Sequence, residues 1–573
     1  MKLSRILSIA SIALLLSGAS VIASAAPAPN SVQNPGSNFL PGLPGYGIAQ
    51  GSIIAVYGAN LSGTSLVQAQ TLPLQTTLNN TSISVTVGST TVNLFMVYTL
   101  NSQLAAVLPS NTPVGNGTLT VTYNGQSGST PIVVVASAVG LLTANETGQG
   151  PGIATHVDNS LITATNAAST SEEIQLWATG IGGLTGGASD GAAPGAVQFS
   201  TANVAIYVGG TKLDPSAIKY YGRNPSDPGL DQINIILPAN ITGCQVSLAI
   251  QTGTGASAYV SNTVTLAIAA SGSTCSDQNG FSVSGLTGAF NTNGTASIGV
   301  VNLQQSTFSI AGLGSTSTAS GSASFLKYTP TEFTESTSAF QPSIGSCIIS
   351  IQNSLNTGTP NPPTGLDAGT QIGVTPPAGS VFNMTPTASQ KGYYSTAFGS
   401  VSQISPGVYQ ITGPGGADVK AFTTSLTVPP NLTWSNQAAV TGSPIVRANG
   451  VTITWTGGDP SSYAFIEGYS TNNNPNNASA TLGALFICIA PISADSFTVP
   501  PAVTLSLPGS GSAGSNPSGL IALGTTSTPK TFSAGGLDFG YATSTSFVGS
   551  SVVWQSAIRL CFTAARQNMQ VCR

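Results

Sequence analysis

The chain is a succession of short runs rich in β-branched residues, separated by clusters of glycine, proline and asparagine. Representative runs lie at 52–57, 82–87, 118–123 and 131–135. Runs of this length with frequent turn residues between them are typical of β-sandwiches. Almost no segment beyond the first 25 residues keeps an apolar 3.6-residue period for three turns, which argues against helices. The sequence therefore predicts an all-β fold with very little helix.

A repeat of about 120–130 residues organises the N-terminal half. Each copy has a strand that ends in a glycine turn, then a strand followed by a hairpin, then a strand that ends at Leu-Pro. The matching segments are 54–61 with 175–182, 82–88 with 202–209, and 101–109 with 231–238. The repeat length suits one seven-stranded sandwich with its loops. The alternation within the strands places Val85, Val87, Ile206 and Val208 in the two cores.

Both copies resemble the immunoglobulin-like IPT/TIG sandwiches that are common in large exported proteins of soil bacteria. The resemblance covers residues 45–270. It rests on the apolar strand with its glycine turn, the Val-x-Val-Gly hairpin and the strand that ends at Leu-Pro. The first copy departs from this pattern with Ala105 where the second has Asn234. The resemblance implies an immunoglobulin-like fold and export from the cell, and it brings no catalytic residues.

An export signal is predicted at the N-terminus. Lys2 and Arg5 precede an apolar run at 6–16, and residues 23–25 (Ala-Ser-Ala) have the small-x-small pattern of a signal-peptidase site. The run is interrupted by serines and is shorter than the roughly 20 apolar residues of a membrane span. We therefore expect residues 1–25 to be removed. The mature chain is expected to be secreted, or periplasmic, without a membrane span.

The rest of the chain divides into five predicted segments. Their boundaries follow the repeat and a shift toward serine, glycine and threonine after Cys275. The segments are sandwich 1 at 45–137, sandwich 2 at 145–270, a β-rich domain at 278–430, a further β-sandwich at 431–556 and a C-terminal tail at 557–573. The predicted fold is thus all-β, with several immunoglobulin-like β-sandwich domains in tandem.

Charged residues make up only 5% of the chain, against about a quarter of an ordinary soluble protein. The net charge is −4, and lysines and arginines form no run. Nucleic acids and anionic membrane surfaces are both recognised by clustered basic residues, so the sequence excludes both as partners. Serine, threonine, asparagine and glycine must provide the polar surface, which suits weak polar recognition.

The six cysteines of an exported chain favour disulfides over a metal site, because no CxxC pattern is present and His156, the single histidine, is distant from all of them. We expect Cys244 to pair with Cys275 across one hairpin, Cys561 with Cys572 in a small terminal loop, and Cys347 with Cys488 between the third and fourth units. No metal site and no cofactor are predicted.

Candidate catalytic groups are sparse. His156 and Asp158 would share a face if they lie in one strand, but no Gly-x-Ser-x-Gly elbow accompanies them, so a loop histidine is the preferred interpretation. The adjacent Glu172 and Glu173 would point to opposite faces of a strand.

Asp459 and Glu467 lie at the two ends of a predicted hairpin and form a candidate glycosidase pair. The simpler interpretation is that both are solvated turn residues. An oxygen-rich loop region is a weak candidate for calcium, although ordinary Asx turns explain its sequence. Its residues are Asp214, Asn224, Asp227 and Asp231.

The C-terminal half is the predicted location of any ligand site, because residues 431–500 combine aromatic side chains with short amides. The candidate contacts are Tyr463, Tyr469, Asp459 and Glu467. Trp434 and Trp455 are each expected to fill a sandwich core. The tyrosine pairs Tyr220–Tyr221 and Tyr393–Tyr394 are expected to be half-buried in sheets rather than to bind sugar.

The sequence favours a non-enzymatic, secreted, multi-domain β-sandwich protein that acts in adhesion, in surface structure or in binding an extracellular polymer such as a carbohydrate. A cell-surface protein is the other expected kind of partner. The alternative is a secreted, glycosidase-like hydrolase whose site lies in 278–556, with the N-terminal sandwiches as spacers. Two carboxyl groups across a cleft would favour the alternative.

Overall fold

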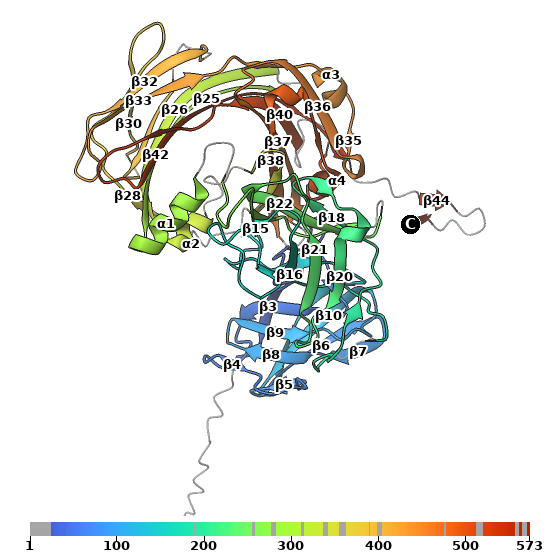
Figure 1. Ribbon diagram of the computed structural model, residues 1–573. Coiled ribbons are helices and arrows are strands. Elements are labelled where there is room, and N and C mark those ends of the chain that lie inside the picture. The colour runs from blue at the N-terminus through green and yellow to red at the C-terminus, as the bar shows by residue number, and fades with distance from the viewer. Residues whose placement is uncertain are drawn as a thin grey trace, which may run out of the picture.

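The computed structural model of the chain shows two small sandwiches at one end and a large curved sheet at the other (Figure 1). It describes residues 25–573, apart from 188–189, 255–257, 277–281, 311–313, 336–341, 354–361, 389, 398–403, 475–476, 512–518, 556–560, 564–569 and 573. The predicted signal peptide lies outside the described residues, except for its last residue. No helix in the described part of the chain is long and apolar enough to cross a membrane.

The first sandwich packs two sheets face to face. The sheets have the orders β1-β3-β9-β8-β4 and β2-β11-β10-β6-β5, and β7 pairs with β6. Their strands are β1 (Ala28–Gln33), β2 (Ile48–Ala49), β3 (Ile53–Ala59), β4 (Val67–Gln68), β5 (Thr77–Leu78), β6 (Thr81–Val87), β7 (Thr90–Asn93), β8 (Phe95–Thr99), β9 (Gln103–Val107), β10 (Gly115–Tyr123) and β11 (Gln126–Val135).

The second sandwich has the sheets β12-β16-β21-β20-β17, with β14 on β16, and β13-β24-β22-β18-β19, with β15 on β24 and β23 on β22. The elements are β12 (Gly140–Leu141), β13 (Gly150–Pro151), β14 (Ala154–His156), β15 (Ala168–Ser169), β16 (Glu173–Thr179), β17 (Gln198–Phe199), β18 (Val204–Val208), β19 (Thr211–Lys212), η1 (Pro215–Ala217), β20 (Ile218–Arg223), β21 (Asp231–Ile236), β22 (Gly243–Thr252), β23 (Tyr259–Val260) and β24 (Val264–Ala269).

The repeated segments occupy equivalent places in the two sandwiches. β3 pairs with β9 as β16 pairs with β21, and β6 forms a hairpin with β7 as β18 does with β19. Gly88, Gly209 and Gly210 adopt positive φ in these hairpin turns, which favours glycine there. Val85, Val87, Ile206 and Val208 are all buried in the cores, as predicted. The fold is all-β, with immunoglobulin-like sandwich domains in tandem.

The C-terminal half is built on a 14-stranded sheet with the order β27-β38-β37-β40-β42-β25-β26-β31-β30-β29-β32-β33, to which β28 and β41 are added. Its strands are β25 (Ala296–Ile310), β26 (Gly314–Tyr328), β27 (Cys347–Asn353), β28 (Thr364–Gly365), β29 (Ile372–Thr375), β30 (Phe382–Pro386), β31 (Tyr393–Ala397), β32 (Gly407–Gly413), β33 (Phe422–Val428), β37 (Tyr463–Asn474), β38 (Asn477–Pro491), β40 (Gly519–Thr526), β41 (Lys530–Phe532) and β42 (Phe539–Ser551).

Smaller elements accompany this sheet. A three-stranded sheet has the order β34-β36-β39, and β35 pairs with β43. These elements and the helices are α1 (Val283–Asn293), α2 (Pro330–Glu335), β34 (Leu432–Trp434), α3 (Gln437–Thr441), β35 (Ile445–Val446), η4 (Arg447–Asn449), β36 (Val451–Gly457), η5 (Ile492–Ala494), β39 (Ser496–Val499), α4 (Pro501–Leu505), β43 (Trp554–Gln555), β44 (Cys561–Thr563) and β45 (Gln570–Cys572).

The large sheet bends into an arc with other elements on its outer side (Figure 1). At one end, β32 and β33 close a core over β25, β26 and β42. At the other end, the sheet β34-β36-β39 packs on β37 and β38, and Trp434 and Trp455 are buried there, as expected. Strands from both sides of residue 430 belong to this one sheet. Residue 430 is therefore not a sheet boundary. The proposed domain boundary at this residue stays a prediction about folding units.

Two disulfides staple these elements. Cys244 bonds to Cys275 and Cys347 bonds to Cys488, the pairings that the sequence predicts. Closing loops of these lengths stabilises a fold by about 3–5 kcal/mol each in the chain-entropy model. Cys561 and Cys572 lie opposite each other in the β44–β45 hairpin, but their side chains lie outside the described residues, so this third pairing stays a prediction.

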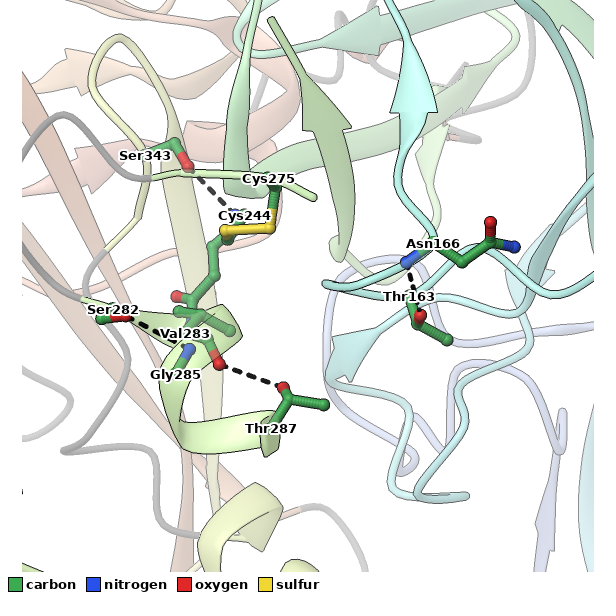
Figure 2. The surroundings of a disulfide bond; sticks show 10 residues. Thr163, Asn166, Cys244, Cys275, Ser282, Val283, Gly285, Thr287 and Ser343 are labelled. Atoms are coloured by element: carbon green, nitrogen blue, oxygen red, sulfur yellow. Dashed lines mark hydrogen bonds between the residues drawn. A yellow bond between two sulfur atoms is a disulfide. The ribbon is translucent and has the colours of Figure 1, made fainter. Parts of the chain in front are cut away.

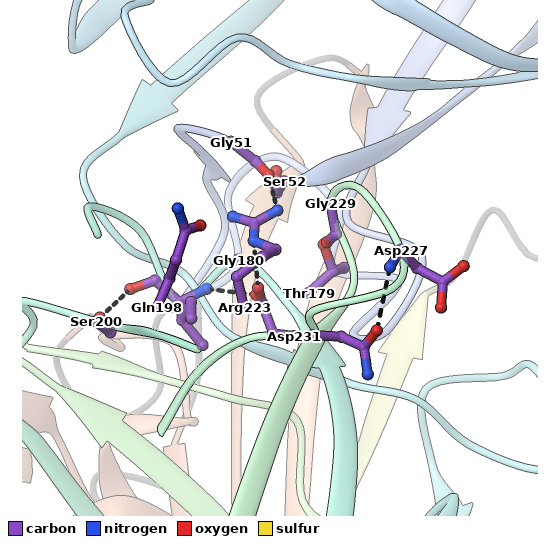
Figure 3. A network of polar contacts seen from close by, with 12 residues as sticks. Gly51, Ser52, Thr179, Gly180, Gln198, Ser200, Arg223, Asp227, Gly229 and Asp231 are labelled. Atoms are coloured by element: carbon purple, nitrogen blue, oxygen red, sulfur yellow. Dashed lines mark hydrogen bonds and ion pairs between the residues drawn. The ribbon is translucent and has the colours of Figure 1, made fainter. Parts of the chain in front are cut away.

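A polar junction joins the two sandwiches (Figure 3). Arg223 Nε lies 3.0 Å from Asp231 Oδ1, and both side chains are almost fully buried. The Arg223 guanidinium also donates to the Gly51 carbonyl of the first sandwich. Thr179 of the second sandwich accepts a hydrogen bond from the Ile53 N–H at 2.9 Å. Burial raises the pKa of Asp231 to about 6, although the Arg223 charge and hydrogen bonds from backbone N–H groups lower it.

The second sandwich is in turn attached to the C-terminal half. The Gln245 N–H donates to the Ser343 hydroxyl at 3.0 Å, and the Ser343 N–H donates back to the Gln245 carbonyl at 3.2 Å. Ala249 and Val260 of the sandwich share an apolar cluster with Ala502 of α4. The successive units therefore contact one another through hydrogen bonds and apolar packing and are not joined by linkers alone.

We predict that the Arg223–Asp231 ion pair is needed for the stability of the junction. Arg223→Met leaves a buried carboxylate without its counter-ion and should cost about 3–5 kcal/mol of unfolding free energy. Urea unfolding at pH 7 measures this cost. The double variant Arg223→Met/Asp231→Leu removes both charges and should regain most of the loss. A single variant within about 1 kcal/mol of the wild type would contradict the prediction.

Candidate functional site

Strand β37 separates its side chains onto two faces of the large sheet. Ala464 and Ile466 point into the core that β34, β36 and β39 cover. Phe465, Glu467 and Tyr469 alternate with them and therefore lie on the opposite face, where each is partly exposed. We call this opposite face the inner face, because it lines the inside of the arc in Figure 1.

The register of the neighbouring strands extends this face across the sheet. Phe465 lies opposite Gly524 of β40, and Gly524 lies opposite Phe547 of β42. Adjacent strands are about 4.8 Å apart, so Phe465 and Phe547 are separated by roughly 10 Å with a glycine between them. In the next row, Glu467 lies opposite Ala522 of β40, and Ala522 lies opposite Gly549 of β42. Gly549 in turn lies opposite Phe308 of β25.

These residues form what we call the inner-face platform, made of Phe308, Phe465, Tyr469 and Phe547 with Ala522, Gly524 and Gly549 between them. The rings of Phe308 and Phe547 pack edge to face with centroids 5.3 Å apart. A Cβ on Gly549 would lie 2.4 Å from the Phe308 ring, and a Cβ on Gly524 would lie 2.5 Å from the Phe547 Cβ. The glycines therefore let the aromatic rings lie close to the sheet.

Glu467 is the one acidic residue of the six strands that carry or flank this platform, β25, β26, β37, β38, β40 and β42. It has no hydrogen bond or ion pair with any described residue, and burial raises its pKa. Burial also raises the pKa of the neighbouring Tyr469. The platform is thus a largely apolar, aromatic surface with two groups that can form hydrogen bonds, the Glu467 carboxyl group and the Tyr469 hydroxyl.

Asp459 does not join this platform. Its Oδ1 accepts hydrogen bonds from the Ser461 N–H and hydroxyl at 2.9 and 2.8 Å, which is an Asx turn before β37 begins. Glu467 lies four residues into β37, or about 13 Å along the strand from Tyr463. The structure brings Tyr463, Glu467 and Tyr469 onto one face and leaves Asp459 in the turn, so it does not assemble the two acids as a glycosidase pair.

The platform residues Phe308 and Phe547 were not among the residues singled out from the sequence. Each follows the period-two pattern of its own strand, which is a usable signal. Their proximity to Phe465 depends on the pairing of β25 with β42 and of β42 with β40, however, and the sequence does not show which strands pair.

A hollow of about 440 Å³ lies beside the β29–β30 hairpin. Its lining is apolar and has no charged residue: Pro376, Pro377, Ala378, Gly379, Ser380, Val381, Phe382, Ala397, Ile404, Ser405 and Tyr409. The Tyr409 hydroxyl donates a hydrogen bond to the Ser405 carbonyl at 3.0 Å. Nothing in the sequence pattern had indicated this hollow.

His156 is the last residue of β14, and its imidazole ring joins this strand to two neighbouring segments of the second sandwich. Its Nδ1 lies 2.5 Å from Glu172 Oε1, and its Nε2 lies 3.3 Å from the Asn166 carbonyl oxygen. Asp158 instead accepts from Ser160, so His156 and Asp158 do not form a catalytic pair. Burial lowers the histidine pKa, but the hydrogen bonds to Glu172 and Asn166 and the Glu172 charge outweigh it and raise the pKa.

The remaining candidates from the sequence also have structural contacts. Tyr220, Tyr221 and Tyr394 are buried. Asp214 caps η1, and the side-chain oxygen of Asn224 accepts from the N–H groups of residues 226 and 227 in an Asx turn. In the described part of the chain, no group of three or more histidine, cysteine, aspartate or glutamate side chains could hold a metal ion.

Comparisons with known proteins identify no relative. No family model and no curated protein match the chain. Among solved structures, a tetra-tandem repeat from the extending region of a large adhesion protein is 14% identical, covers 89% of this chain and 96% of its own, and has a TM-score of 0.13. Sidekick-1 immunoglobulin domains 1–4 are 10% identical, cover 91% of this chain and 99% of their own, and have a TM-score of 0.12. Values this low carry no argument, and the fold assignment rests on the sheets described above.

We predict a pH-dependent contribution of His156 to stability. The histidine pKa is about 6.5 in an unfolded chain and is raised in the fold. The contribution is therefore fully present below about pH 6.5 and is lost as the pH rises through the folded-state value. Unfolding of the wild type and of His156→Gln between pH 5.5 and 8.5 should show a difference that shrinks as the pH rises. A difference that is constant across this range would refute the assignment.

Glu467→Gln should stabilise the chain at pH 7. Burial raises the pKa of Glu467 above its ordinary value of 4.5, so protonation favours the fold and the wild type loses stability as the pH rises through the folded-state value. The variant has no charge to lose, so its advantage should vanish near pH 4. Thermal unfolding at both pH values measures it, with Glu146→Gln on an exposed loop as the control. A destabilised variant at pH 7 would contradict this prediction.

Proposed function

We propose that the chain is a non-enzymatic, exported, multi-domain β-sandwich protein that binds an extracellular polymer, and that the inner-face platform is the contact surface for carbohydrate. The observation that supports this most directly is the spacing of aromatic rings by glycines on one face of a bent sheet. Flat rings cover the apolar faces of sugars.

The neighbouring groups supply polar contacts for such a ligand. Gln304 and Thr545 lie opposite each other on the same face, one row away from Phe547. Both side chains are partly exposed. An amide and hydroxyls around apolar rings suit the mixed surface of a polysaccharide better than a charged ligand, because Glu467 is the one acidic residue of the described platform strands.

We infer that the two N-terminal sandwiches act as an ordered spacer. Their interfaces bury an ion pair and several interdomain hydrogen bonds, so they can hold the large sheet away from a point of attachment. We also infer that both sandwiches are of the IPT/TIG type, since their repeated strands and hairpins follow the pattern of that family. The glycosidase-like alternative gains no support, because Glu467 has no second carboxyl group across the platform among the described residues.

We expect the purified mature chain to be retained by at least one insoluble polysaccharide in a pull-down. Phe465→Ala and Tyr469→Ala should each weaken retention about tenfold, or ~1.4 kcal/mol, because each removes a contact ring. Tyr98→Ala, a partly exposed tyrosine in the first sandwich, is the matched control and should bind like the wild type. Binding that both platform variants leave unchanged would remove the platform from the proposal. Failure to bind any polymer would end the proposal itself.

A further inference from the structure

The chain enters the large sheet at β25 and leaves it at β42, and these two strands lie side by side. β25 begins at Ala296 and β42 ends at Ser551. Their pairing is parallel and runs from Ile298–Phe539 to Ser309–Ser550. The entry point and the exit point therefore lie at opposite ends of this pair of strands.

This arrangement determines how the unit responds when the chain is pulled on both sides of it. Tension drives β25 and β42 past each other along their own axes, so the hydrogen bonds of all 12 residue pairs are loaded together. The β25–β26 hairpin behaves differently, because the chain enters and leaves it at the same end. Such a hairpin opens one residue pair at a time, which requires a smaller force.

Side chains also resist this sliding. Phe308 of β25 and Phe547 of β42 pack edge to face with centroids 5.3 Å apart. On the other face of the sheet, Val301 of β25 and Ala542 of β42 belong to the same buried apolar cluster. These contacts must break in the same step as the hydrogen bonds between the two strands.

Parallel pairing occupies the same place in the two sandwiches. In the first sandwich the last strand, β11, pairs in parallel with β2. In the second sandwich the last strand, β24, pairs in parallel with β13 and β15. Each of these pairings has only two residue pairs, so the β25–β42 pairing offers a much longer connection between the start and the end of a unit.

Two disulfides shorten the path along which tension travels. Cys275 follows β24 and is bonded to Cys244 of β22 (Figure 2). Tension that arrives at Cys275 therefore passes directly into β22 and leaves the residues between the two cysteines unloaded. Cys347 and Cys488 likewise join β27 to β38, within the segment that connects β25 to β42. If β25 and β42 separate, this bond keeps a stretch of 141 residues from extending.

We propose that the large sheet is a load-bearing unit, in which shear between β25 and β42 carries tension that acts along the chain. This adds a mechanical function to the polymer binding proposed above. It rests on the strand order and not on a ligand, so a chain that retains no polysaccharide can still bear load. The two proposals therefore succeed or fail independently.

The first test pulls the same strand in two directions. Azide-bearing side chains at two of the positions Asn291, Lys327 and Val553, each at least partly exposed, attach the full mature chain to a single-molecule force instrument. Pulling between Asn291 and Val553 loads β25 against β42 in shear, and pulling between Asn291 and Lys327 opens the β25–β26 hairpin. We expect the shear geometry to need about twofold more force or greater. Equal forces in the two geometries would refute the proposal, and a Tm equal to that of the wild type is the control for folding.

The second test pulls the chain from both ends and identifies each unit by its disulfide. With reductant present, failure of the large unit should be followed by a further extension of about 490 Å from the 141-residue stretch, and failure of the second sandwich by about 110 Å. We expect the large unit to fail last, because forced unfolding follows the unfolding rate and its parallel pairing is the longest. Failure of the large unit before either sandwich would overturn the proposal.

Discussion

The parallel pairing of β25 with β42 is the constraint on which the C-terminal half depends. It joins segments about 240 residues apart in the chain and runs for 12 residue pairs, from Ile298–Phe539 to Ser309–Ser550. Parallel strands need a long crossover connection. Here the connection between the two strands contains the strands that cover the outer side of the sheet. The pairing therefore places the core residues of β25 and β42 against β32 and β33.

The same pairing decides the chemistry of the inner face. Once β25 lies beside β42, Phe308 packs on Phe547, and the glycines at 524 and 549 leave room for both rings. The opposite face of these strands carries core residues such as Val301, Leu303 and Ala542. A strand can serve both purposes because its side chains alternate, so one periodic sequence supplies a buried layer and a solvent-facing floor.

Low charge has consequences throughout the molecule. With few ion pairs at hand, the chain places one of them, Arg223–Asp231, inside the junction between its sandwiches, where an unpaired charge would be most costly. Hydroxyl pairs on exposed sheet faces, such as Thr120 with Ser129 and Thr307 with Ser317, provide polar surface in place of charges. Against this background, the half-buried Glu467 has no hydrogen bond or ion pair with any described residue, and burial raises its pKa, so its environment favours the protonated form.

The sequence by itself determined the all-β class, the two repeated sandwiches and the pairing of Cys244 with Cys275, because alternation, turn residues and short loop closure are local signals. The pairing of Cys347 with Cys488, 141 residues apart, was predicted only because these two cysteines remained. It also singled out Tyr463, Glu467 and Tyr469 as candidate ligand contacts. Only the tertiary structure decided that Asp459 turns away, that strands on both sides of residue 430 share one sheet, and that Phe308 lies on the inner-face platform. These features depend on which distant strands pair, and strand pairing is set by the packing of the whole chain rather than by any local pattern.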